Sequence, residues 1–472
     1  MTLSKKSVLC TIVAFCLLLL SGCAKEENTS LLNPQEPLTI SVWTYYNGPQ
    51  LNAFTSLVDE FNRTKGKEQG IVVESFNHGS VEELQEKVLD SVNGKVGAEP
   101  VPNIFAAYAD TAHAVDQEGL LADMAPFLTA EEQALYVESY LTEGAFKEGE
   151  IKIFPIAKST EVLLLNKTDW EPFAKATGTG TDALATWEGI VETAEKYYEW
   201  SGGHALFGRD AMANYMLVGA MQLGEEIAPV TDGKAEIHFS EKTARKLWDC
   251  YYVPYVKGHF SSSGRFRSDD VKTGNILCYV GSSSSATYFP KEVVPDDHDT
   301  HPIEMTVLPT PHFEGCPSIA VQQGAGMVVT NASEAEVYAS VLFLKWFTEP
   351  ERNIRFSLGS GYMPVMRSTN NMDAIATYAP DMDDNMRAIL TVSVDTVSEM
   401  ELYYPKAFDN GTEVRRILEY SMSDLAVQDR ATVMERIRRG TPEEEACRDF
   451  LSDTYFDAWY RDITTRLEEL AH

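Results

Sequence analysis

The chain has 472 residues, with 39 Lys and Arg against 71 Asp and Glu, so its formal net charge is −32 at pH 7. A charge of this sign and size repels phosphate backbones and anionic lipid headgroups, which argues strongly against nucleic-acid binding. The length is sufficient for two domains that each bury a large hydrophobic core.

The first 22 residues have the pattern of a secretory signal peptide. Lys5 and Lys6 precede an apolar run from Val8 to Leu20, which is too short to span a bilayer comfortably. The sequence Leu20-Ser21-Gly22-Cys23 resembles a bacterial lipoprotein signal, in which Cys23 is acylated and becomes the first residue after cleavage. A plain signal peptide or an N-terminal anchor helix is the alternative.

Residues 23–37 are mostly polar and are expected to form a flexible tether, which places a lipid-anchored protein on the extracellular face of the bacterial cytoplasmic membrane. Removal of the signal takes two lysines with it and brings the net charge to −34. Four other cysteines remain, and their wide spacing without a CxxC motif argues against zinc, while any disulfide pairing stays open. They are Cys250, Cys278, Cys316 and Cys447.

The first part of the mature chain alternates strands with helices. Strands are predicted at 38–43, 71–76 and 103–108, and helices at 50–64, 81–92 and from 111 to 118. This order predicts a parallel sheet with right-handed crossovers, in which ligands bind at the carboxyl ends of the strands. The side chains that follow these strand ends are Tyr45, Tyr46, Asn77, His78, Tyr108 and Asp110.

The segment Ile153–Lys167 is predicted to carry the chain from a first lobe into a second. Val162 to Leu165 has the composition of a buried strand, and Pro155 marks an edge or a crossing point before it. Ligands favour such crossovers, so the polar side chains between these points are expected to face a cleft between the lobes. They are Lys158, Ser159, Thr160 and Glu161. An ordinary strand that follows a surface loop is the alternative.

The second lobe is predicted to contain helices at 187–200, 214–223 and 242–255 and a strand at 275–280. That strand ends in Gly281 and a run of four serines, and a helix start follows at 286. Backbone N–H groups and hydroxyls that meet at such a turn form a site for an anion or a hydroxyl group. Ser282 and Ser283 are the candidates, and a mobile serine loop before a helix cap is the alternative.

The chain is predicted to return to the first lobe through strands at 305–309 and 324–330 and a helix at 334–347. A tight turn at 359–364 then presents Tyr362, and the remainder is mainly helical. The sequence thus predicts an α/β protein in which residues 38–156 and 309–345 form the first lobe. Residues 157–308 and 346–472 form the second, including a helical C-terminal extension.

Several stretches, in order and spacing, resemble the extracellular solute-binding proteins of ABC importers. The resemblance implies a two-lobed, type II periplasmic-binding-protein-like fold with mostly parallel sheets, which closes on a small solute and delivers it to the transmembrane subunits of a permease. It implies no catalysis, cofactor or metal, and we expect a monomer. The stretches are ISVWTYYNG, NIFAAYADTAHAVDQEGLLADM, FPIAKSTEVLLLNK with TWEGIVETAEK, and GNILCYVGSSSSATYF with MTVLPTP.

Within this family the likeness is greatest to the glycerol-3-phosphate-binding branch, through GHFSSSGRFRSDDVKTGN, the serine turn, GSGYMPVMRST and NGTEVRRILE. The resemblance implies that a phosphate is held by Ser159, Ser283 or Ser282, Tyr362 and Arg415, with Tyr108 and Gly324 also facing the ligand. Two departures stand out: Ala109 replaces an acidic residue, with Asp110 one position later, and the stretch 207–212 lacks two tryptophans. The residues implied to hold the phosphate thus match the branch, while those implied to contact the polyol differ from it.

Other interpretations remain at this stage. A neutral sugar or oligosaccharide is the main alternative ligand, and Arg415 could instead form a surface ion pair with Glu413 or Glu419. An anchored glycosidase would need two carboxylates across a cleft, for which Asp110 and Glu161 are the available pair. An acidic stretch with two histidines at 296–301 could bind a metal, but its position after Pro295 favours a solvated loop.

Overall fold

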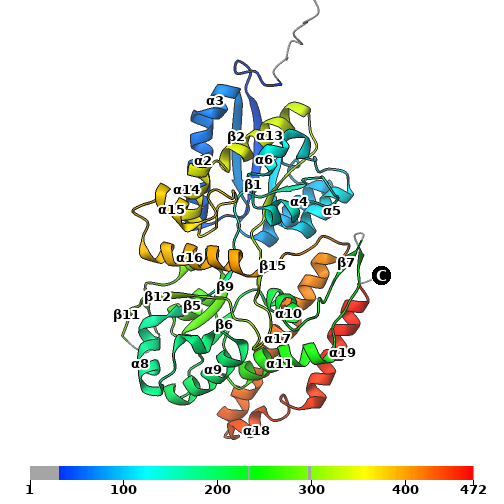
Figure 1. Ribbon diagram of the computed structural model, residues 1–472. Helices are drawn as coiled ribbons and strands as arrows, with labels where there is room; N and C mark the ends of the chain where they lie inside the picture. The colour runs from blue at the N-terminus through cyan, green and yellow to red at the C-terminus, as the bar shows by residue number, and fades with distance from the viewer. Residues whose placement is uncertain (1–30, 232–233, 296–298, 471–472) are drawn as a thin grey trace, which may run out of the picture.

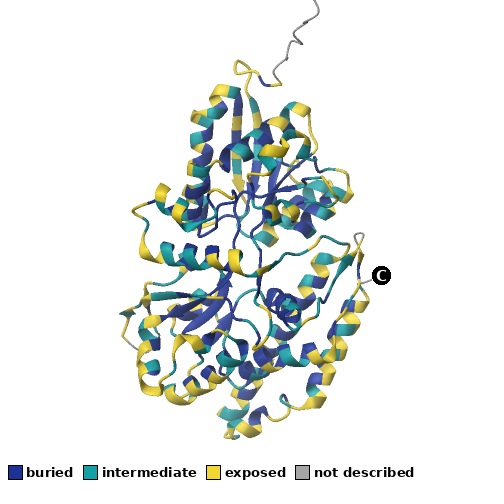
Figure 2. Cartoon of the chain, viewed as in Figure 1, coloured by how far each residue is buried: buried dark blue, intermediate teal, exposed yellow. Residues whose placement is uncertain are grey.

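The computed structural model describes residues 31–231, 234–295 and 299–470, and these fold into two lobes that each contain a β-sheet flanked by helices (Figure 1). Buried residues concentrate on the strands and on the inner faces of the helices (Figure 2). The predicted signal and Cys23 lie outside the described residues. In the part of the chain that is described, no helix has the length and apolar character needed to cross a membrane.

The sheet of the first lobe has the strand order β2-β1-β3-β14-β4. β1 pairs in parallel with β2 and β3, so these three strands end at one edge of the sheet, facing the second lobe. β14 is antiparallel to both of its neighbours. The bounds are β1 Leu38–Thr44, β2 Ile71–Asn77, β3 Ile104–Ala107, β4 Ile153–Phe154 and β14 Gly326–Val329.

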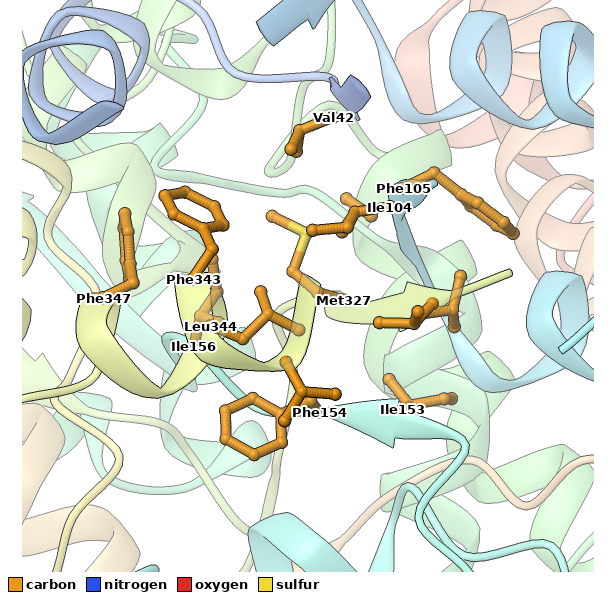
Figure 3. Close-up of a cluster of buried hydrophobic side chains, with 14 of the residues drawn as sticks. Val42, Ile104, Phe105, Ile153, Phe154, Ile156, Met327, Phe343, Leu344 and Phe347 are labelled. Carbon is orange, nitrogen blue, oxygen red and sulfur yellow. The ribbon is translucent and has the colours of Figure 1, made fainter. Parts of the chain in front are cut away.

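Helices cover both faces of this sheet and bury its apolar side chains. Figure 3 shows part of the core, where Met327 of β14 lies among Ile104 and the helix residues Phe343 and Leu344. The helices of this lobe are α2 Gly48–Arg63, α3 Lys65–Gln69, α4 Val81–Val92, α5 Ala109–Gln117, α6 Ala130–Gln133, α7 Glu138–Thr142, α13 Glu334–Phe347 and α14 Pro350–Ser360, with the 3-10 turn η1 Ala125–Phe127.

The sheet of the second lobe has the order β12-β5-β9-β6, and it is mixed where mostly parallel strands were predicted. β5 is antiparallel to both β12 and β9, and only β6 and β9 run in parallel. The reason is that β5 receives the chain directly from the first lobe and runs away from it, while the other three strands run back toward it. The bounds are β5 Glu161–Asn166, β6 Phe207–Arg209, β9 Cys278–Ser282 and β12 Met305–Pro309.

The helices of the second lobe enclose a core rich in aromatic rings, in which the indole of Trp248 stacks on Tyr252 with 3.6 Å between ring centroids. The 28-residue helix α17 packs on α10 and α11 and completes this core. These helices are α8 Lys167–Thr177, α9 Trp187–Ser201, α10 Met212–Gln222, α11 Glu241–Val256, α12 Arg267–Lys272, α17 Gly411–Arg438, α18 Glu443–Cys447 and α19 Asp453–Glu468, with 3-10 turns η2 Thr181–Leu184 and η3 Ser283–Tyr288.

Short strand pairs and two further helices complete the fold. α16 packs on one face of the second sheet, where Ile389 contacts the cluster around Val162 and Leu164, and it lies between the two lobes in Figure 1. The remaining elements are α15 Met372–Tyr378, α16 Asp384–Glu399, β7 Val230–Thr231, β8 Lys234–Ala235, β10 Glu292–Val293, β11 His301–Pro302, β13 Ile319–Val321 and β15 Glu401–Tyr403.

Three neighbouring stretches of chain join the lobes. Residues 155–160 run between β4 and β5, and they are hydrogen-bonded on one side to residues 322–325 and on the other to the turn at 361–364. Ser159 exchanges backbone hydrogen bonds with Gln323 at 2.8 and 2.9 Å, and Lys158 does so with Met363 at 3.2 and 2.6 Å. Lateral bonding of this kind makes a narrow strap about which the lobes can move.

Two expected lobe boundaries are corrected by the packing. The return to the first lobe does not occur at 309, because β12 belongs to the second sheet and Phe313 is buried in the second core; it occurs at 322–325. The chain also stays in the first lobe beyond 346, since α14 packs on α2 and Phe356 belongs to the first core. Apolar segments of this size fit either core by composition alone, so periodicity could not assign them.

The expected flexible tether is shorter than residues 23–37. Leu32 is only 5% exposed and belongs to the core of the first lobe, and the Leu38 N–H donates to the carbonyl of Gly70. The described residues from 32 onward are therefore anchored on the first lobe, because one leucine in an otherwise polar stretch finds an apolar surface.

Candidate functional site

Hydroxyl groups from both lobes meet beside the crossing segments. Tyr45 and Tyr108 follow β1 and β3 of the first lobe, as the strand-end argument predicts, and the two phenols lie close enough to influence each other's pKa. The Tyr45 hydroxyl also lies 3.4 Å from that of Tyr362, which comes from the crossing turn. Ser284 of the second lobe lowers the pKa of Tyr362 against the larger upward effect of burial. Hydroxyl groups of both lobes are thus gathered around the crossing segments.

Burial keeps these phenols protonated. Desolvation raises the pKa of Tyr45 well above its ordinary value, and the neighbouring Tyr362 and Tyr108 raise it further. Desolvation likewise raises the pKa of Tyr108 and Tyr362. Each ring therefore presents an apolar face and a neutral hydroxyl that donates or accepts a hydrogen bond at any physiological pH.

The serine turn contributes on the second-lobe side, through one of the two expected serines, Ser282, and through Ser284, which was not expected. The Ser282 hydroxyl donates to the Ser159 hydroxyl at 3.3 Å and lies 2.9 Å from that of Ser284. Ser283 is fully buried and its hydroxyl donates to the carbonyl of Gly361. Ser282 and Ser284 therefore join the hydroxyl cluster, while Ser283 ties the turn to the first lobe. The turn opens a 3-10 helix, η3.

Gly324 lies where two crossing segments and the Tyr362 ring come together. Its φ of +99° is one that L side chains rarely adopt. A Cβ at this position would lie 3.2 Å from both the Ala157 carbonyl oxygen and the Tyr362 ring. A glycine is therefore needed here for both the backbone conformation and the close packing of the strap.

Arg415 reaches the same region from the first turns of α17. Its Nη2 donates to the side-chain oxygen of Asn214 at 2.8 Å, and Nη1 is buried without a hydrogen-bond partner among the described residues. The charge of Arg415 also lowers the pKa of Tyr108 and of Tyr403, against the larger upward effect of burial on both. The guanidinium thus lies between the lobes, close to the tyrosine that ends β3.

The surface ion pairs considered for Arg415 are not formed. Glu413 pairs with Arg416 at 3.3 Å, and the Glu419 carboxylate accepts from the Met212 and Ala213 N–H groups at the start of α10. Both neighbouring acids are therefore engaged elsewhere, and Arg415 has no salt bridge within the part of the chain that the structure describes.

Asn214 and Gln323 are two polar residues of this region that the sequence analysis missed. The Asn214 amide nitrogen donates to Glu161 Oε1 at 2.9 Å and to Gln323 Oε1 at 3.1 Å. Arg209 binds both carboxylate oxygens of the same Glu161 at 2.8 and 2.9 Å. No local pattern marks Asn214, because it lies within an apolar helix that resembles a core element.

Two further strand-end residues, Tyr46 and Asp110, do not join the hydroxyl cluster. Tyr46 is 2% exposed and packs on Phe54 and Phe356, so it is a core residue rather than part of the hydroxyl cluster. Asp110 lies at the rim, where its Oδ2 accepts from the Thr412 hydroxyl of α17 at 3.2 Å. The sequence does not distinguish the adjacent residues Tyr45 and Tyr46. Only the path of the chain after β1 directs Tyr46 into the core and Tyr45 toward the hydroxyl cluster.

The two lobes are in contact in this structure. Besides Asp110 and Thr412, the Tyr288 hydroxyl of η3 donates to the Asn47 carbonyl at 3.0 Å. These two contacts bridge the lobes on either side of the crossing segments. A cavity of about 10 Å³ lies within the first lobe beside Tyr45 and Tyr108, and residues of that lobe alone line it.

The two carboxylates considered for catalysis are both engaged by other groups. Glu161 is held by Arg209 and is 5% exposed, while Asp110 is bonded to Thr412, so neither faces the other as a free acid. Within the described ranges no group of three or more His, Cys, Asp or Glu could hold a metal ion. Residues 296–298 of the acidic loop lie outside those ranges, and His301 pairs with Asp169 at 2.8 Å.

The disulfide question is answered for the described cysteines, since Cys250, Cys278, Cys316 and Cys447 are all free. Burial raises the pKa of the Cys250 thiol to about 12 and raises that of Cys278 further, so both are protonated, inert core residues.

Comparison with known proteins gives a consistent result. The family model described as "Bacterial extracellular solute-binding protein" matches residues 56–382. UgpB from Mycobacterium tuberculosis, solved with glycerophosphocholine, superposes with a TM-score of 0.68 at 16% identity, covering 92% of this chain and 99% of that one. No curated protein sequence matches the chain.

Two further structures show the same architecture. The cyclic alpha-maltosyl-1,6-maltose binding protein from Arthrobacter globiformis has a TM-score of 0.66 at 16% identity, over 92% of this chain and 100% of that one. A solute-binding protein from Agrobacterium radiobacter K84, solved with ribitol, has a TM-score of 0.63 at 16% identity, over 93% and 100%. At these identities the likeness establishes the two-lobed, type II periplasmic-binding-protein-like fold.

Proposed function

This chain belongs to the bacterial extracellular solute-binding proteins, and we propose that it captures a carbohydrate or glycerol-phosphate-like solute that carries an anionic group. Proteins of this family are the non-enzymatic binding components of ABC importers and deliver small solutes to a permease. The proposal concerns which solute is bound, where it is bound, and how the protein is held at the membrane.

The unpartnered side of the Arg415 guanidinium is the observation that carries the proposal. A buried Nη1 without an acceptor is costly, because a guanidinium that is removed from water needs its hydrogen bonds. A phosphate or carboxylate oxygen between the lobes would supply the missing acceptor and the opposite charge. The hydroxyls of Ser159, Ser282 and Tyr362 lie beside the same crossing and would satisfy the remaining oxygens.

Closure supplies the mechanism. Arg415 and the serine turn belong to the second lobe, while Tyr45 and Tyr108 belong to the first. A solute that contacts both groups stabilises the closed arrangement over the open one and thereby shifts the population. Because the protein is strongly negative, an anion gains nothing from long-range steering, and short-range donors must provide the affinity.

The proposed location rests on the lipoprotein-like pattern of the N-terminal sequence. We propose that Cys23 is acylated and holds the mature protein, as a monomer, on the extracellular face of the cytoplasmic membrane. The anchored N-terminal segment at Leu32 then keeps the first lobe near the lipid, within reach of the permease subunits.

A neutral sugar or oligosaccharide is the second candidate. The tyrosine rings favour it, since aromatic faces bind sugar rings without any charge. The two candidates differ in their dependence on Arg415.

A thermal-shift panel separates them. Purified protein would be tested with glycerol 3-phosphate, glycerophosphocholine, maltose and ribitol, each in large excess, where a ligand at a hundred times its Kd adds about 2.7 kcal/mol of stability. Arg415→Ala is expected to remove the shift given by the phosphate compounds. Arg416→Ala, on the same helix and paired with Glu413 at the surface, is the matched control and should leave it unchanged. A shift by a neutral sugar that persists in Arg415→Ala would refute the anion proposal.

A further inference from the structure

Asn214 stands between the free guanidinium and a buried carboxylate. It is 1% exposed on α10, its oxygen accepts from Arg415, and its nitrogen donates to Glu161. We propose that Asn214 is a positioning residue, a polar spacer that stops Arg415 from pairing with Glu161 and so keeps the Arg415 charge available for the solute. The inference rests on the proposed binding of an anionic solute and concerns the specificity of that same site.

The orientation of the Asn214 amide is determined by its partners. Its nitrogen lies 2.9 Å from Glu161 Oε1, an atom that only accepts, and 3.1 Å from Gln323 Oε1. The Gln323 amide is itself oriented, because its nitrogen donates to the Thr160 carbonyl. The opposite arrangement would set the Asn214 oxygen against two acceptors. The oxygen must therefore face Arg415, which is a donor.

Without such a spacer Arg415 would be neutralised. A guanidinium and a carboxylate in a buried region pair strongly, often through two hydrogen bonds. Glu161 already has a full partner in Arg209, both being at most 5% exposed, so its charge is balanced without Arg415. Asn214 adds a neutral donor to Glu161 and a neutral acceptor to Arg415. The result is one satisfied ion pair and one cation whose second nitrogen is unbonded within the described chain.

Asn214 also connects this charge to the strap between the lobes. Gln323, its second acceptor, exchanges backbone hydrogen bonds with Ser159 in the neighbouring crossing segment. The position of the guanidinium is thereby coupled to the segment about which the lobes move. A change at Asn214 should consequently alter anion binding rather than only the stability of α10.

The test uses two readouts on the full-length protein. The first is modification of Arg415 by phenylglyoxal in the ligand-free protein, followed by peptide mass spectrometry, since this reagent attacks guanidinium groups that are not held by a carboxylate. The second is the affinity for glycerol 3-phosphate by calorimetry. The variants are Asn214→Asp, which places a carboxylate on Arg415, and Asn214→Ala, which removes the spacer.

Both variants are expected to slow Arg415 modification at least threefold and to weaken glycerol 3-phosphate binding at least tenfold. Loss of a merely structural hydrogen bond would instead make Arg415 more mobile and speed its modification in Asn214→Ala. Unchanged or faster modification in that variant overturns the inference, whatever solute the protein binds. Absence of any anion binding by the wild type, with modification slowed as expected, counts against the proposed function alone.

Gln222→Glu is the matched control for the change from amide to carboxylate. Gln222 lies on the same helix, is 3% exposed, and donates to the Ile319 carbonyl at 3.0 Å, away from Arg415. This substitution makes the same change from amide to carboxylate at a similarly buried position. The modification of Arg415 and the affinity for glycerol 3-phosphate should therefore both remain at the wild-type level. Equal slowing in this control would show that the effect does not depend on the contact with Arg415, which overturns the spacer role.

Discussion

Lys158 lies at the centre of the strap between the lobes, and its removal tests whether a buried ion pair holds that strap. Lys158 is 1% exposed, and its Nζ donates to Glu143 Oε2 at 2.6 Å and to the Gly324 carbonyl at 3.0 Å. Glu143 is 8% exposed and also accepts from the side chain of Gln322. One carboxylate of the first lobe therefore anchors two of the three crossing segments.

Lys158→Met keeps the aliphatic volume and removes the charge. The buried Glu143 carboxylate is then left with the Gln322 amide in place of a cation, and loss of one partner of such a pair costs about 3–5 kcal/mol. We expect the free energy of unfolding to fall by that amount. The double variant Lys158→Met/Glu143→Gln no longer contains an unpaired buried carboxylate. Its free energy of unfolding should therefore fall by only about 1–2 kcal/mol, from the hydrogen bonds that are lost.

The measurement is urea unfolding followed by tryptophan fluorescence, with Lys246→Met as the control. Lys246 pairs with Glu188 at 2.7 Å, but the lysine side chain is 39% exposed, so its loss should cost at most about 1 kcal/mol. The reasoning fails if Lys158→Met costs no more than the control. It fails equally if the double variant is as unstable as the single one.

Two further predictions concern the same region and the second lobe. Gly324→Ala should lower the free energy of unfolding by about 2–3 kcal/mol and weaken solute binding, because positive φ and a 3.2 Å contact act together. Gly440→Ala, with φ of +96° but open space around it, should cost about 1 kcal/mol, and equal losses in urea titrations would contradict the packing argument. Burial lowers the pKa of His259 to about 4, below the value near 6.5 expected in the unfolded chain, so stability should be complete above about pH 6.5 and fall by about 2 kcal/mol as the pH drops toward 4. His259→Phe should lack this acid-dependent loss, and parallel stability–pH curves for the two proteins would exclude the mechanism.

Much of the first lobe was predictable because its signals are local. β1, β2 and α4 follow directly from alternation and from amphipathic spacing, and their observed bounds differ from the predicted ones by at most one residue. The N-terminus of α4 is marked by Ser80, whose hydroxyl accepts from the Glu83 N–H. Strand ends then indicated Tyr45 and Tyr108, because the carboxyl ends of parallel strands share one edge of a sheet.

The assignment of segments to lobes was not predictable in the same way. β12 is a short apolar strand whose composition would fit either sheet. Its place is decided by pairing with β5, in which five residues of each strand lie opposite one another although the two strands are far apart in the sequence. The same holds for α14, whose apolar face suits either core. Periodicity says that a face is buried, while the partner that buries it depends on the path of the intervening chain.

The sequence by itself determined that the chain is an acidic, two-lobed α/β protein whose polar residues gather at a crossing between the lobes. Those features arise from composition, periodicity and strand ends, which act over a few residues. Only the tertiary structure decided that Ser282 and Ser284 face the crossing instead of Ser283, that Tyr46 is core, and that Arg415 is free of Glu413 and Glu419. Chemically equivalent neighbours differ only in direction, and direction is set by contacts with residues hundreds of positions away, such as Asn214 for Arg415.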